Sequence, residues 1–88
     1  MDVTMNQLEL HLTDHGFKRG WQRNIYPNWL HISTAEIFVL GKINQTRDKQ
    51  IKEIGTLTKI LLPDIKFYVR DHQDIVTMVK RKRKVVAY

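Results

Sequence analysis

The chain contains no cysteine in its 88 residues. Without disulfides or zinc-binding thiolates, it must be stabilised by packing around one hydrophobic core, since a domain of this size buries only about 60–65% of the surface of its unfolded chain. We therefore expect a single domain. The absence of cysteine is also typical of proteins kept in a reducing compartment, so we expect a cytoplasmic location.

The sequence predicts neither export nor membrane insertion. Residues 1–7 lack the basic-then-apolar order of a secretory signal. No apolar run approaches the roughly 18 residues that span a bilayer. We expect no membrane partner.

Positive charge is concentrated near one end of the chain, whose formal net charge is +6. Residues 1–79 hold ten Lys or Arg against nine Asp or Glu, whereas the next five residues are all basic. The sequence thus predicts a near-neutral body over residues 1–79 and a basic segment over residues 80–88 that belongs to the same domain. The basic run consists of Lys80, Arg81, Lys82, Arg83 and Lys84.

Capping residues near the N-terminus predict a first helix. Thr4 and Gln7 have the spacing of a capping box, so the helix should begin at Met5. Gly16 suits the left-handed position after a helix, so this helix should end near His15.

The next stretch, residues 17–43, predicts three strands. It is rich in aromatic and β-branched residues and is interrupted by Gly20, by the Pro27-Asn28 pair and by Gly41. We expect strands near residues 21–25, 29–33 and 37–43. Residues 37–40 are apolar at every position, which predicts a central strand covered on both faces by helices or by a partner subunit.

The second half predicts a helix from about Arg47 that stops at Pro63, because apolar residues recur three and four apart. Gly55 inside it costs about 1 kcal/mol relative to alanine, which indicates close packing or a weak point in the helix assignment. Residues 65–69 alternate as a strand. Asp74 can cap a final helix over residues 75–79, our preferred reading, although these residues also suit a strand.

Together these elements predict an α+β fold. We expect a small antiparallel sheet of three to four strands packed by two helices, in the order α-β-β-β-α-β, with a C-terminal helix or strand.

The basic run indicates contact with nucleic acid, because each Lys or Arg that neutralises a phosphate releases condensed counterions. Two other interpretations remain open: a solvated tail that keeps the protein soluble, and weak attachment to anionic lipid. No amphipathic anchor accompanies the run, so lipid ranks last.

Residues 17–29 interleave cations with large aromatic side chains, the combination that lets bases stack while phosphates are neutralised. The alternative is that these aromatics are mainly core, because so small a domain needs them for burial. The residues of this second candidate surface are Lys18, Arg19, Arg23, Trp21 and Tyr26.

Metal and catalytic sites are not expected. His11 and His15 lie four apart, yet the segment between them lacks the glutamate of the HExxH motif and no third ligand follows at a fixed spacing. We expect no cofactor and no enzymatic activity, since no two acid, base or nucleophile candidates form a recognised motif. A small histidine-dependent ribonuclease stays open.

The sequence therefore favours a nucleic-acid-binding accessory or regulatory module. The alternative is a protein-interaction or dimerisation module with no nucleic-acid role, in which the apolar segments 37–40 and 85–88 are completed by a partner.

Overall fold

The computed structural model describes residues 10–81, which form five strands and two helices. Within these residues, no helix combines the length and hydropathy needed to cross a membrane. The elements in chain order are β1 (His11–Leu12), α1 (Asp14–Gln22), α2 (Ile32–Gln45), β2 (Gln50–Ile54), β3 (Leu57–Leu61), β4 (Ile65–Arg70) and β5 (Asp74–Lys80).

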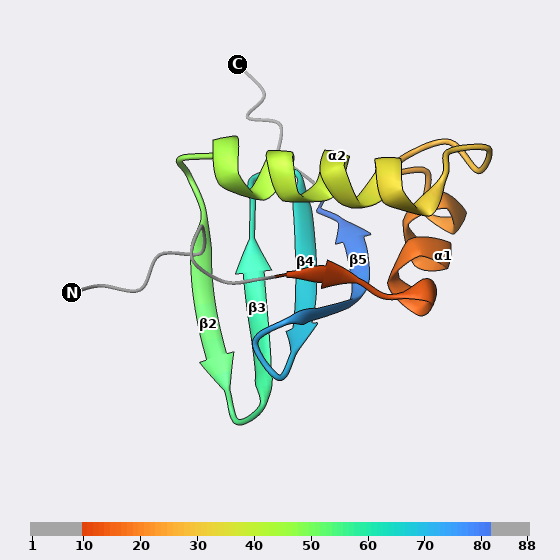
Figure 1. Ribbon diagram of the computed structural model, residues 1–88. Coiled ribbons are helices and arrows are strands. Elements are labelled where there is room, and N and C mark those ends of the chain that lie inside the picture. The colour runs from red at the N-terminus through yellow and green to blue at the C-terminus, as the bar shows by residue number, and fades with distance from the viewer. Residues whose placement is uncertain (1–9, 82–88) are drawn as a thin grey trace, which may run out of the picture.

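The five strands form one sheet in the order β1-β5-β4-β3-β2. β1 is parallel to β5, and all other neighbours are antiparallel. α2 crosses one face of this sheet, and α1 packs beside β5 (Figure 1). Neither helix covers the opposite face, so the described fold has two layers with one side of the sheet left open.

The core lies between α2 and the covered face of the sheet. β4 buries Ile65, Phe67 and Val69 at alternate positions, as expected for a strand that is covered on one face only. α2 contributes buried residues four positions apart, including Val39 and Ile43, which places them on one side of the helix.

α1 packs unusually close to β5. Its cap residue Thr13 accepts a hydrogen bond from the Gly16 amide at 3.0 Å, and the Thr13 hydroxyl donates to the Ile75 carbonyl at 2.9 Å. A Cβ atom on Gly16 would collide with that same carbonyl. Glycine at this position therefore lets the helix approach the strand backbone.

Two tight turns set the strand registers. Gly55 has φ of 61° in the turn between β2 and β3, a conformation that favours glycine. Asp71 and His72, with φ of 54° and 59°, turn the chain between β4 and β5. The Gln73 amide closes that second turn by donating to the Arg70 carbonyl at 3.1 Å.

The α+β class predicted from the sequence is confirmed, whereas the number and order of elements differ. The sheet has five strands instead of three or four, and the described order is β-α-α-β-β-β-β. The strand predicted at residues 65–69 is confirmed as β4, and the final segment adopts the strand alternative, as β5.

The predicted end of the first helix is wrong. His11 lies in β1, and His15 lies in the first turn of α1 instead of ending a helix. Gly16 is inside α1, where close packing on Ile75 decides its position in place of a left-handed turn. The predicted start at Met5 lies outside the described residues.

The three strands predicted between residues 21 and 43 are also wrong. Residues 23–31 form a turn-rich connection, and residues 32–45 form α2. Burial at four-residue spacing decides the helix here, even though the residues involved are intrinsically good strand formers. Val39 is fully buried in this helix, while Ile37 and Phe38 point outward with 73% and 43% of their surface exposed.

The helix predicted from Arg47 to Pro63 is replaced by the hairpin of β2 and β3. Gly55, which weakened the helix assignment, is the turn of that hairpin. Thr58 and Ile60 are buried on β3 with period two, so the true repeat is that of a strand.

Candidate nucleic-acid interface

The basic run begins inside the folded domain. Lys80 is the last residue of β5, and Arg81 follows it directly; both are exposed. The Arg81 amide donates to the Asp64 carbonyl at 2.8 Å, and its guanidinium Nη1 donates to the Leu62 carbonyl at 2.8 Å. The first two cations are thus held against the domain. Lys82, Arg83 and Lys84 lie outside the described residues.

Tyr26 of the second predicted surface is part of the core. Only 5% of its surface is exposed, and its hydroxyl donates to the Phe17 carbonyl at 2.8 Å. The Phe17 and Tyr26 rings stack with centroids 5.9 Å apart. Burial raises the pKa of the Tyr26 hydroxyl to about 12. Trp21 is half-buried against the same core. Both aromatic side chains therefore pack in or against the core, as in the alternative interpretation of this segment.

Arg23 also has a structural role. Its Nη1 donates to the Thr77 hydroxyl at 2.9 Å and to the Met78 carbonyl at 2.8 Å. These bonds provide partners for polar groups in the part of β5 that β1 does not pair with. Lys18 is exposed on α1, and Arg19 is partly exposed and contacts the side chain of Gln22 at 3.4 Å. Among the predicted cations of this segment, Lys18 is therefore the one with the most accessible side chain.

A different basic surface occupies the uncovered side of the sheet. Because Phe67 and Val69 face the helices, the alternation of β4 directs Lys66, Tyr68 and Arg70 to the other side. The strand register places Lys59 and Lys52 on this side as well, through the pairs Lys59–Tyr68 and Lys52–Lys59. We call this surface the open face and define it by Lys52, Lys59, Lys66, Tyr68 and Arg70.

Tyr68 is the centre of the open face. The Lys66 Nζ lies 5.4 Å and the Lys59 Nζ 5.8 Å from its ring centroid, both within the range of cation–π attraction. Asp74, opposite Arg70, is the one carboxylate that the described strands place on this side. Two cations thus lie beside the Tyr68 ring, and Lys52 and Arg70 occupy neighbouring register positions, with a single acidic side chain at the rim. The same side also carries the apolar residues Ile54, Leu57, Leu61 and Val79.

Lys52 and Lys59 are direct cross-strand neighbours. Like charges directly opposite each other on a sheet destabilise the pair of strands, so the fold gains nothing from this arrangement. A ligand with dense negative charge would relieve the repulsion.

The basic run begins at the same end of the sheet but not on the open face. Val79 pairs with Lys66 on the open side, whereas Lys80 pairs with the buried Ile65 and therefore lies on the helix side of the sheet. At the same end of the sheet lies a cavity of about 440 Å³. Its lining includes three cations, Arg47, Lys49 and Arg81, together with the carboxylate of Asp48.

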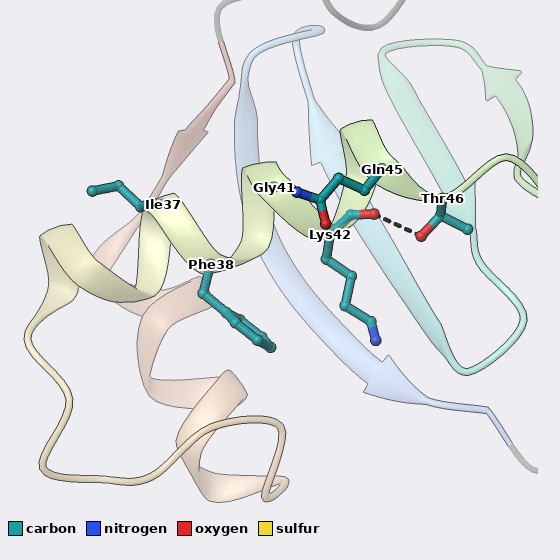
Figure 2. Close-up of a pocket in the computed structure, with 6 residues that line it drawn as sticks. All are labelled: Ile37, Phe38, Gly41, Lys42, Gln45 and Thr46. Carbon is teal, nitrogen blue, oxygen red and sulfur yellow. Dashed lines mark hydrogen bonds between the residues drawn. The ribbon is translucent and has the colours of Figure 1, made fainter.

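An apolar groove lies on the outer side of α2 (Figure 2). Phe38 and Lys42 project from the same side of the helix, while Ile37 points away from them. Lys42 forms an ion pair with Asp64 at 2.7 Å, which leaves an apolar surface beside a neutralised charge. The groove of about 530 Å³ is lined by Ile37, Phe38, Gly41, Lys42, Gln45 and Thr46.

The histidines do not gather into a metal site in the described part of the chain. No group of three or more His, Asp or Glu side chains with metal-binding geometry occurs there. His11 and His15 belong to different elements, β1 and α1, instead of one helix. His72 Nδ1 lies 3.3 Å from the Thr58 hydroxyl and 3.8 Å from a Glu53 oxygen. Because both contacts use the same nitrogen, the ring cannot relay a proton between them.

Sequence reasoning missed the open face because it assigned residues 47–62 to a helix. The signal was nevertheless present in β4, where Lys66, Tyr68 and Arg70 alternate with apolar residues. Comparisons with protein-family models, with curated proteins and with solved structures found no match to this chain. The function proposed below is accordingly derived from the geometry and charge of the described residues.

Proposed function

We propose that this protein is a nucleic-acid-binding module that contacts a single strand through the open face, with the basic run that starts at the end of β5 as a second contact. The observation that carries the proposal is the placement of Lys59 and Lys66 beside Tyr68, with Lys52 and Arg70 at neighbouring register positions, on a sheet surface that neither helix covers.

The chemistry of this surface suits a polyanion with flat, stackable bases. Each phosphate that a cation neutralises releases counterions, which makes binding depend on salt with a slope of about 0.7 per contact for single strands. An aromatic side chain on a sheet adds about 1–3 kcal/mol per stacked base. Tyr68 is only partly buried; Lys59 is its cross-strand partner on β3 and Lys66 lies two residues before it on β4, so base stacking and phosphate contact can occur together.

A salt series tests the proposal. Binding of a fluorescent single-stranded oligonucleotide is measured by anisotropy for the intact protein and for the variant K59Q/K66Q. We expect the slope of log K against log salt to fall by about 1.4 in this variant, since two phosphate contacts are lost. Replacing the basic run, Lys80 to Lys84, by glutamine measures its separate contribution.

The matched control is K18Q/R19Q, which removes the same charge from the exposed side of α1. We expect it to bind nearly as tightly as the intact protein. If K59Q/K66Q binds as well as the intact chain while K18Q/R19Q loses affinity, the open face is not the interface and the segment predicted from the sequence is. If the intact protein does not bind at low salt, the proposal is refuted.

Tyr68 provides a second readout. The variant Y68F keeps the ring and should bind normally, whereas Y68A should lose about 5- to 160-fold in affinity because base stacking is lost. Equal binding by Y68A, after thermal unfolding has shown that it is folded, would exclude stacking on this ring.

The groove on α2 favours a second candidate function, which is binding to another protein. Ile37 and Phe38 remain exposed on a helix whose other side is packed into the core. Single exposed apolar side chains are common on protein surfaces, whereas apolar side chains that line a groove indicate a binding site. An I37S/F38S variant that binds nucleic acid normally but no longer captures a protein partner would separate the two functions.

A further inference from the structure

β2 forms a free edge of the sheet. Among the described residues it pairs only with β3, and all five of its residues are exposed, with Ile51 at 43% and Ile54 at 60%. Proteins usually block such edges with proline, a bulge, charged side chains or a covering segment, because unpaired backbone groups recruit further strands. Lys52 and Glu53 are the charged residues of β2. β2 contains no proline and keeps a regular register with β3 throughout.

The hairpin geometry shows which backbone groups point outward. Ile54 and Leu57 close a two-residue turn and form its hydrogen-bonded pair. Hydrogen-bonded and non-hydrogen-bonded pairs alternate along an antiparallel ladder. The amide and carbonyl groups of Ile51 and Glu53 are therefore directed away from β3, toward the free edge.

A second copy of the same chain can form backbone hydrogen bonds with these groups in three registers, which differ in the residue that faces its own counterpart at the two-fold axis. Two copies related by a two-fold axis perpendicular to the sheet pair antiparallel with their open faces on the same side. A register centred on Lys52 opposes two lysines, and one centred on Glu53 opposes two glutamates; both are unfavourable. A register centred on Ile51 opposes two isoleucines and places Gln50 opposite Lys52.

The same register centred on Ile51 brings Lys49 of each copy opposite Glu53 of the other, which gives two opposite-charge pairs. Lys49 directly precedes β2, and its Nζ, which donates to the Ile43 carbonyl at 2.9 Å, is on the helix side of the sheet. Glu53 is on that side too, because it pairs with the buried Thr58. Charge complementarity therefore selects one register among the three.

We propose that this protein self-associates through antiparallel pairing of β2 with β2 of a second copy, centred on Ile51 and flanked by two Lys49–Glu53 pairs. The contact is between two short strands, and it buries less than the roughly 1,200 Å² of a standard stable interface. The dimer is consequently weak, with a dissociation constant on the order of 100 µM.

Charge reversal tests the register. In the variant K49E, and equally in E53K, both pairs become like-charge pairs, and the dissociation constant should rise about 3- to 10-fold. An equimolar mixture of K49E and E53K should associate as well as the intact protein, because every pair in the mixed dimer is again attractive. Sedimentation velocity or light scattering over a concentration series measures each case.

This rescue cannot arise within one chain. The side chains of residues 49 and 53 are four positions apart along an extended segment, about 13 Å, so they do not pair with each other. K18E, which makes the same charge change on α1, is the control and should associate like the intact protein. Thermal unfolding of each variant tests whether the fold is retained when the contact of Lys49 with the Ile43 carbonyl is lost.

Two results would overturn the proposal. The first is an intact protein that stays monomeric up to millimolar concentration, as it would if another segment or another protein occupies the edge. The second is a mixture of K49E and E53K that associates no better than each variant alone. Both readouts are independent of nucleic-acid binding.

Discussion

The cross-strand pair of Lys52 and Lys59 makes a prediction that links stability to function. Replacing Lys52 by glutamate turns a like-charge pair into an opposite-charge pair at the same register position. Cross-strand charge pairs are worth about 0.2–1 kcal/mol, so removing the repulsion and adding an attraction should stabilise the fold by about 0.5–1 kcal/mol, Lys52 being exposed. For a domain of this size, that raises the melting temperature by roughly 2–8 °C.

Thermal unfolding followed by circular dichroism at low salt measures the effect. K52Q removes the repulsion without adding the attraction and should fall between the intact protein and K52E. The gain should shrink in about 1 M salt, where the Debye length is only about 3 Å. The same variant should bind a single strand more weakly, with a salt slope reduced by about 0.7 or more.

The reasoning is refuted if K52E is no more stable than the intact protein at low salt, or if its gain in stability does not respond to salt. Either result would mean that Lys52 and Lys59 avoid each other by rotamer changes, and the charge density assigned to the open face would then be too high. A K52E variant that is more stable yet binds nucleic acid normally would remove Lys52 from the interface.

The remaining predictions concern packing, a turn and pH. G16A should destabilise the fold by about 1–3 kcal/mol because its Cβ meets the Ile75 carbonyl, whereas G41A, whose Cβ has nothing within 4 Å, should be neutral or gain up to about 1 kcal/mol of helix propensity. G55A should cost about 1 kcal/mol in chemical denaturation because φ is 61° at that turn. Burial raises the pKa of Tyr26 from 10.0 to about 12. The contribution of this shift to stability is complete below pH 10 and is lost as the pH rises from 10 to about 12. Unfolding midpoints measured over this pH range for the intact protein and for Y26F should show the loss in the intact protein alone.

The sequence predicted the fold class and strand β4, whereas the helix expected over residues 47–63 and the preferred helix over residues 75–79 are strands. Residues 65–69 show a clean period of two, and no competing pattern obscures it. In residues 32–45, strand-forming side chains occupy a helix because Ala35, Val39 and Ile43 must meet the sheet from one side. Local propensity is weaker than this tertiary requirement, so composition alone predicted the wrong element.

The hairpin shows a different limit. Ile51, Ile54, Leu57 and Leu61 recur three and four apart, which imitates an amphipathic helix, while the period-two burial of Thr58 and Ile60 becomes visible only in the folded sheet. The left-handed Gly55 decides between the two patterns. The candidate site followed the same error, since the open face exists only when Lys52 and Lys59 lie on neighbouring strands.

Self-association and nucleic-acid binding should be coupled if both proposals hold. The two-fold axis keeps both open faces on one side, so paired copies present ten adjacent strands, spanning about 43 Å at the usual strand spacing. An oligonucleotide of about 20 nucleotides can contact both copies, whereas one of about 5 nucleotides fits a single face. The 20-nucleotide oligonucleotide should therefore strengthen dimerisation, and dimerisation should strengthen its binding by the same factor. The 5-nucleotide oligonucleotide should have no effect on dimerisation. Equal effects of both lengths in sedimentation velocity would show that the two surfaces act independently.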